Sequence, residues 1–242
     1  MTHPNPPFPQ QSQPIPGRTD QMQPRPDHGE ESYRGSGKLD GMAALVTGGD
    51  SGIGRAVALA YAREGADLLI SYLDEHDEAQ ETQRLVEEAG KRAVLKPGDL
   101  QEADHCRSLV QAAHEAFGRL DILVNNAGGP PPGDFRDWDR DVWIAAVDAN
   151  MLTPIFLIKA TVDGMIERKF GRVVNITSSS VKAPIEVLGL SNGARAGLTG
   201  FIAGVARKTV GANVTINNLL PGAFDTDRMN GNIAAAANKT GA

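Results

Sequence analysis

Three glycines with the spacing Gly48-x-x-x-Gly52-x-Gly54 are the residues of this sequence whose chemistry is easiest to interpret. They follow a short apolar run, residues 43–46, and open a segment, residues 53–61, with apolar residues at helical spacing. Backbone N–H groups at a helix N-terminus bind anions, and glycines leave room for a pyrophosphate to approach the backbone. The stretch therefore predicts a strand, a phosphate-binding loop and a helix, in that order.

From residue 38 onward, strand and helix patterns continue to alternate. Strands are expected at 43–47, 67–72, 92–96, 121–125, 172–177 and 213–219, and helices at 52–64, 76–90, 101–118, 138–169 (with a break at Pro154) and 191–210. This alternation predicts an α/β protein with one doubly wound parallel sheet and right-handed crossovers. We expect its ligand crevice at the carboxyl ends of the strands, where the strand order reverses.

Charge and composition exclude several classes of partner. The net charge of -6 argues against nucleic acid or an anionic membrane surface. No apolar run approaches the roughly 18 residues that a membrane-spanning helix needs. The single cysteine, Cys106, falls in a helical pattern and is expected to be a buried apolar residue. These features predict a cytoplasmic protein in a reducing compartment, and no metal site is expected.

The stretch from Ala44 to Ala56 resembles the cofactor fingerprint of the short-chain dehydrogenase/reductase family. Further motifs agree with that family in order and spacing, so that the resemblance covers about residues 40–228. It implies a Rossmann fold and an NAD(P)-dependent oxidoreductase that transfers a hydride between the nicotinamide and a small carbonyl or alcohol substrate. It also implies a homo-oligomer, a dimer or a tetramer, because the helices expected at 138–169 and 191–210 match those that pair subunits in the family.

The resemblance further implies which residues contact the cofactor. They are Gly48, Asp50, Ser51, Gly52, Ile53, Gly54, Arg55, Tyr72, Asp99, Leu100, Asn126, Ala127, Gly128, Arg195, Pro221, Gly222, Phe224 and Thr226. Several of these residues fall in expected turns, and any one of them could be there only to form the turn, because Asn, Asp, Gly and Pro favour turns anyway. Their occurrence together in the family's order favours cofactor binding.

The preference between NADP and NAD depends on the end of the second expected strand. An acidic residue there would bond the ribose 2′-hydroxyl and select NAD, but the usual position is Tyr72. The missing carboxylate removes a repulsion against a 2′-phosphate, and Arg55 could add a positive charge. The sequence therefore favours NADP over NAD, unless the loop folds back and brings Asp74 to the site.

Four residues match the family's catalytic positions: Asn150, Ser178, Ser191 and Arg195. Ser191 and Arg195 stand where the family has a tyrosine and a lysine, as in a variant branch that this stretch resembles, and no tyrosine follows Tyr72. A tyrosine of reference pKa about 10, lowered by a lysine, can donate a proton near neutral pH. A serine is a much weaker acid, and an arginine keeps its proton.

Three interpretations of this pair remain open. Ser191 could pass a proton through a water held by Asn150, while Ser178 binds the substrate carbonyl. Lys182 could deliver the proton if it were desolvated against Arg195. Alternatively, the protein could bind the dinucleotide as a catalytically weak or inactive homologue.

Residues 1–38 carry eight of the fifteen prolines and no apolar periodicity, which predicts a disordered tail before a domain at 39–242. Its anchors for a neighbouring subunit would be Phe8, Ile15 and Tyr33. At the other end, family members continue past the sixth strand, whereas this chain stops at Ala242. The resemblance therefore implies that the last strand and much of the segment covering the substrate are missing.

Overall fold

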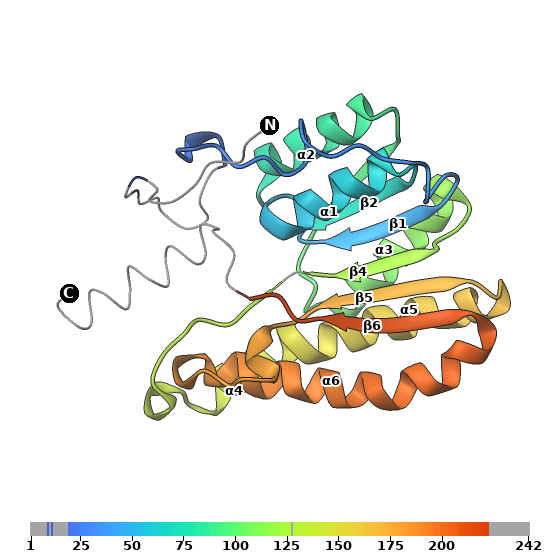
Figure 1. Cartoon of the computed structure of the whole chain (residues 1–242). Helices are drawn as coiled ribbons and strands as arrows, with labels where there is room; N and C mark the ends of the chain where they lie inside the picture. The colour runs from blue at the N-terminus through green and yellow to red at the C-terminus, as the bar shows by residue number, and fades with distance from the viewer. Residues whose placement is uncertain (1–8, 10, 12–18, 127, 223–242) are drawn as a thin grey trace.

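The computed structural model describes residues 9, 11, 19–126 and 128–222. Six parallel strands form one sheet in the order β3-β2-β1-β4-β5-β6 (Figure 1). They are β1 (Ala43–Thr47), β2 (Asp67–Tyr72), β3 (Ala93–Pro97), β4 (Ile122–Asn125), β5 (Gly171–Ile176) and β6 (Val214–Leu219). This order confirms the predicted doubly wound sheet, since the chain runs outward from β1 to β3 and then crosses over to β4.

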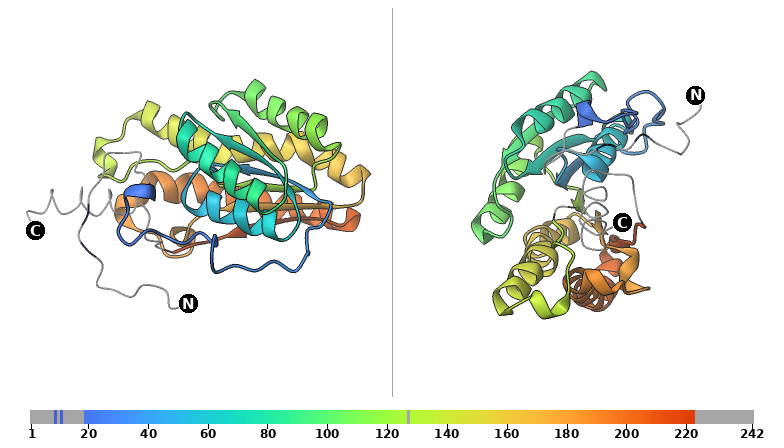
Figure 2. Two further views of the ribbon diagram at one scale, coloured as in Figure 1. Left: turned by 90° about the horizontal axis from the view of Figure 1, so that it is seen from above. Right: turned by 90° about the vertical axis from the view of Figure 1, so that its left-hand side faces the viewer.

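Helices cover both faces of the sheet (Figure 2). One face packs against α1 (Gly52–Arg63) and α2 (His76–Glu88), and the other against α3 (Ala103–Phe117), α5 (Thr153–Glu167) and α6 (Gly189–Thr209). Because β1 and β4 are buried throughout, their sequences are continuous apolar runs, as expected of central parallel strands. The ends of the strands differ from the predicted ends by at most one residue.

The stretch predicted as a helix at 138–169 is interrupted before Pro154. Helix α4 (Arg140–Val147) passes into a π-helical turn, η3 (Asp148–Leu152), and Pro154 lies in the first turn of α5. Proline is tolerated in a first turn because the N–H groups there have no helical partner. The irregular, π-helical turn therefore lies before Pro154 and not at it. By length and composition alone, Arg140–Glu167 could cross a membrane. The core helix of a soluble protein passes the same test, and α5 packs against α3 and the sheet.

The described part of the N-terminal tail packs along α1. The hydroxyl of Tyr33 donates a hydrogen bond to the carboxylate of Glu64, which also accepts hydrogen bonds from the backbone N–H groups of Ser36 (2.9 Å) and Lys38 (3.0 Å). Residues 33–38 thus make contacts in a segment for which the sequence predicts disorder, because the buried carboxylate of Glu64 accepts hydrogen bonds from three of them. Tyr33 binds its own chain here, and the other two expected anchors lie outside the described residues.

Candidate active site

The glycine loop after β1 has the shape that the sequence predicts. Gly48 and Gly52 adopt φ angles of +59° and +51°, in the left-handed region that favours glycine. A Cβ on Gly54 would lie 1.8 Å from the carbonyl oxygen of Gly48, so only glycine lets α1 begin this close to the loop. Within the described part of the chain, no side chain caps α1, and Ser51 occupies the N-cap position. The first-turn N–H groups therefore remain available to an anion.

The side chain of Arg55 lies buried between the glycine loop and α2. It is 1% exposed and forms an ion pair with Glu78 of α2. Nε donates to Oγ1 of Thr82 (2.8 Å), and Nη2 donates to the backbone carbonyl of Asp50 (2.5 Å). The guanidinium thus holds the backbone of the glycine loop in place. Its positive charge, which the sequence suggested would face a 2′-phosphate, is neutralised by Glu78. Sequence reasoning missed Glu78 and Thr82; their i, i+4 spacing on one face of α2 was the available signal.

The end of β2 carries no carboxylate of its own. Tyr72 is buried, and its hydroxyl lies 3.0 Å from Nδ1 of His76. Burial, and then the nearby charge of Asp50, raise the pKa of Tyr72. Asp74, whose return to the site would have favoured NAD, is exposed. The loop carboxylate of Asp50 therefore lies close enough to act on the hydroxyl of Tyr72 at this strand end.

The turn after β4 holds the glycine loop in place. Asn126 donates from its side chain to the carbonyls of Thr47 and Gly48, both at 3.1 Å. Its backbone N–H donates to Oγ1 of Thr47 (2.9 Å). Asn126 thus supports the loop from the neighbouring strand.

The other predicted cofactor residues lie in turns that follow β3 and β6. Leu100 accepts a hydrogen bond from Oγ1 of Thr153 at the start of α5 (3.1 Å), and Asp99 accepts one from the backbone N–H of Gln101 (2.9 Å). The carbonyl of Pro221 accepts from the backbone N–H of Ser179 (2.8 Å), which brings the turn after β6 beside the end of β5. Gly222 is the last described residue. Ile53 lies in the first turn of α1, while Ala127, Phe224 and Thr226 lie outside the described residues.

Arg195 joins three of the four predicted catalytic positions. Nε donates to Oγ of Ser191 one turn earlier on α6, and Nη2 donates to Oδ1 of Asn150, each at 3.2 Å. The same guanidinium donates to the backbone carbonyls of Ile176 (2.7 Å) and Gly128 (3.4 Å). Ser191 and Arg195 are each 9% exposed, and Asn150 is 3% exposed. A fixed cation thus links α6, the π-helical turn and the ends of β4 and β5.

The fourth predicted position, Ser178, follows β5 directly. Its Oγ accepts a hydrogen bond from the backbone N–H of Ser180 (3.1 Å) and lies 2.9 Å from Oγ of Ser180, at the start of the short helix η4 (Ser179–Val181). This helix packs against α6, which carries Ser191. Lys182, the alternative proton donor, is exposed.

A ladder of three asparagine amides, of which Asn125 and Asn175 are buried, joins the carboxyl ends of three strands. Nδ2 of Asn125 donates to Oδ1 of Asn175 (2.8 Å), whose own Nδ2 donates to Oδ1 of Asn218 (3.0 Å). Sequence reasoning did not identify Asn175 or Asn218. An amide inside an apolar strand was the available signal, because buried polar groups need partners. These hydrogen bonds hold the carboxyl ends of β4, β5 and β6 together, and the candidate site lies at these strand ends.

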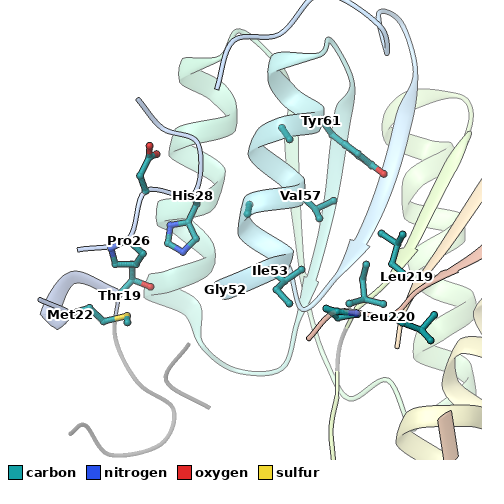
Figure 3. Close-up of a pocket in the computed structure, with 15 residues that line it drawn as sticks. Thr19, Met22, Pro26, His28, Gly52, Ile53, Val57, Tyr61, Leu219 and Leu220 are labelled. Carbon is teal, nitrogen blue, oxygen red and sulfur yellow. The ribbon is translucent and has the colours of Figure 1, made fainter. Parts of the chain in front are cut away.

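A separate cavity of about 720 Å³ lies along α1. Figure 3 shows Met22 and His28 of the tail on one side of it and Leu219 and Leu220 on the other, with α1 between them. Its lining is mostly apolar, and it shares Gly52 and Ile53 with the first turn of α1. The cavity therefore adjoins the glycine loop, and through Ile176, whose carbonyl accepts a hydrogen bond from Arg195, it also borders the Arg195 cluster.

A doubly wound parallel sheet whose first strand leads through a glycine loop into a helix N-terminus defines a dinucleotide-binding α/β protein. Residues 42–237 match the family described as short chain dehydrogenase. The chain belongs to this family, and it is an NAD(P)-dependent oxidoreductase of the short-chain type.

Individual relatives agree with this assignment. The chain is 38% identical over 217 residues to the uncharacterized oxidoreductase YhxD of Bacillus subtilis (strain 168), covering 89% of this chain and 72% of that protein. It is also 38% identical over 217 residues to the uncharacterized oxidoreductase YghA of Escherichia coli (strain K12), covering 89% and 73%. A crystal structure described as a short-chain alcohol dehydrogenase of Sinorhizobium meliloti 1021 matches with a TM-score of 0.74 and 33% identity, covering 78% of this chain and 75% of that one.

Proposed function

We propose that this protein transfers a hydride between a nicotinamide dinucleotide and a small carbonyl or alcohol substrate at a site formed by Asn150, Ser178, Ser191 and Arg195. The observation that carries the proposal is the Arg195 guanidinium, which donates to both Ser191 and Asn150 beside the end of β5. When bound, the dinucleotide supplies the hydride to a carbonyl carbon or removes it from an alcohol. The N–H groups in the first turn of α1 would hold its pyrophosphate.

Ser191 is the proposed proton donor for the substrate oxygen. Its Oγ accepts a hydrogen bond from a cation, so its own hydrogen remains for donation and is the more acidic for it. Arg195 keeps its proton and acts as a fixed positive charge that stabilises a developing alkoxide. Ser178, whose oxygen is already bonded by the N–H of Ser180, would hold the substrate oxygen. Solvent would return the proton to Ser191.

Two observations bear on the alternatives. Lys182 is exposed, so the desolvation that its role as donor requires is not found among the described residues. The side chain of Asn150 accepts from Arg195 and donates to the carbonyl of Ala146 (3.1 Å), which leaves it less able to hold a relay water. The contacts of Asn150 therefore support a second candidate function: a slow enzyme, or a homologue that binds the dinucleotide without turnover.

A second copy of the chain is the proposed partner. Four large apolar side chains remain exposed along the stretch from α4 to α5: Ile144 (47%), Leu152 (36%), Phe156 (41%) and Ile166 (37%). Exposed apolar groups that recur along one helical stretch are typical of an interface. We propose a cytoplasmic homo-oligomer, in keeping with the single, buried and unpaired Cys106.

The first test combines binding with turnover. Fluorescence titration of the purified chain with NADH and with NADPH should show saturable binding of at least one, because the loop and the helix N-terminus are formed. Incubation with a panel of aldehydes and ketones should then consume the reduced cofactor. Binding without turnover on any member of the panel would support the second candidate, and no binding by a folded sample would overturn both.

A further inference from the structure

We propose that Asp50 determines the cofactor preference of this protein and selects NAD(H) over NADP(H). Its carboxylate would accept a hydrogen bond from a hydroxyl of the adenosine ribose and repel a 2′-phosphate. This inference rests on the proposed function, and it reverses the preference for NADP that the sequence favours. The selecting carboxylate would come from the glycine loop, and not from the usual position at the end of β2.

The glycine loop lies directly against the end of β2. The backbone N–H of Gly49 donates to the carbonyl of Ser71 (3.3 Å), and a Cβ on Gly49 would lie 3.0 Å from a methyl group of Ile70. Asp50 follows Gly49, and Tyr72 follows Ser71. The loop therefore carries Asp50 to the strand end at which doubly wound folds bind the ribose.

The carboxylate of Asp50 is held in position. Asp50 is 7% exposed, and Oδ2 accepts a hydrogen bond from Oγ of Ser51 (2.8 Å). Its backbone carbonyl accepts from Nη2 of Arg55 (2.5 Å) and from Oγ1 of Thr82 (3.0 Å). Two donors from two helices thus fix the backbone, so little ordering would be needed when a ribose binds.

Among the described residues, the arginine beneath the loop makes no ion pair with the carboxylate of Asp50. Arg55 forms its ion pair with Glu78, and its contact to Asp50 is with the backbone carbonyl. The effect of Asp50 on the pKa of Tyr72 agrees with a carboxylate near the end of β2. A 2′-phosphate there would meet a negative charge in a partly buried setting, where repulsion is screened less than in water.

The test measures the dissociation constants of NADH and NADPH by fluorescence titration for the wild type, Asp50→Asn and Asp74→Asn. Asparagine keeps the size of the side chain and can still accept from Ser51, but it removes the charge. Asp74 is an exposed acidic residue two positions after Tyr72, which makes its variant the matched control. Thermal unfolding of each variant shows whether the fold is retained.

We expect the wild type to bind NADH at least about tenfold more tightly than NADPH, a difference of about 1.4 kcal/mol. Asp50→Asn should lower that ratio about tenfold, mainly through tighter binding of NADPH, while Asp74→Asn should leave it unchanged. A wild type that binds NADPH as tightly as NADH overturns the inference even if Asp50→Asn fails to fold. A ratio that changes in Asp74→Asn and not in Asp50→Asn also overturns it. If neither cofactor binds to the folded wild type, the proposed function itself is wrong.

Discussion

Nε of Arg195 donates a hydrogen bond to Oγ of Ser191, one turn earlier on α6, across 3.2 Å. This contact couples a side chain that cannot release a proton to one that can. The same guanidinium reaches Asn150 in the π-helical turn, so an irregular helix and a regular one are joined at the end of β5. The site therefore depends on a planar group with several donors.

Replacing Arg195 with lysine should damage both stability and activity. A lysine ammonium cannot donate at once to Ser191, Asn150 and the carbonyl of Ile176, so buried acceptors lose their partners. We expect a loss of about 1–3 kcal/mol in unfolding free energy. Urea denaturation measures it, and Arg207→Lys, at an exposed position on the same helix, is the control. Equal stability of the two variants would contradict the importance of this network.

Gly54→Ala should prevent the glycine loop from closing on α1. The added Cβ would lie 1.8 Å from the carbonyl oxygen of Gly48, which is backbone and cannot rotate away. We expect a lower melting temperature and loss of NADH and NADPH binding. Gly200→Ala in α6 has no atom within 4 Å of its Cβ and should instead gain up to about 1 kcal/mol. Unchanged binding by Gly54→Ala would show that the loop geometry is wrong.

The contact between Tyr33 and Glu64 should make stability depend on acid pH. The hydroxyl of Tyr33, then the N–H groups of Lys38 and Ser36, lower the pKa of Glu64 from 4.5 to about 2. The carboxylate therefore stabilises the fold fully above pH 4.5, and this contribution is lost as the pH falls toward 2. Tyr33→Phe should lose less stability over that interval in thermal scans than the wild type. Tyr61→Phe, whose hydroxyl does not bond Glu64, should follow the wild type.

A charge on α5 should weaken the proposed association between copies. Phe156 is 41% exposed, in the same helical stretch as Leu152, and an aspartate there would bury a charge in any interface that covers it. Light scattering after gel filtration should show a smaller mass for Phe156→Asp. The same change at Phe135, exposed on a short helix away from α5, should leave the mass unchanged. A wild type that is already monomeric would overturn the proposal.

The fold could be predicted because buried parallel strands such as β1 and β4 are continuous apolar runs that glycine turns terminate. The Ser191 and Arg195 pair could be predicted only from the resemblance to the family, and the spacing of four residues places both on one face of a helix. The destination of Arg55 could not, because a charged residue in a first helical turn gives no sign that a glutamate on another helix will pair with it. The π-helical turn before Pro154 and the contacts of Tyr33 also depend on tertiary packing.

The central claim is that Ser191, beside Arg195, donates the proton that accompanies hydride transfer to the substrate, and Ser191→Ala tests it most directly. The turnover number for a carbonyl substrate, followed through the absorbance of the reduced nicotinamide, should fall about 100-fold or more, as expected for loss of a general acid. The dissociation constant of the reduced cofactor should not change, and Ser108→Ala on α3 should match the wild type in both measurements. Unchanged turnover in Ser191→Ala would contradict the claim, as would turnover that arises only in the double variant Ser191→Tyr/Arg195→Lys.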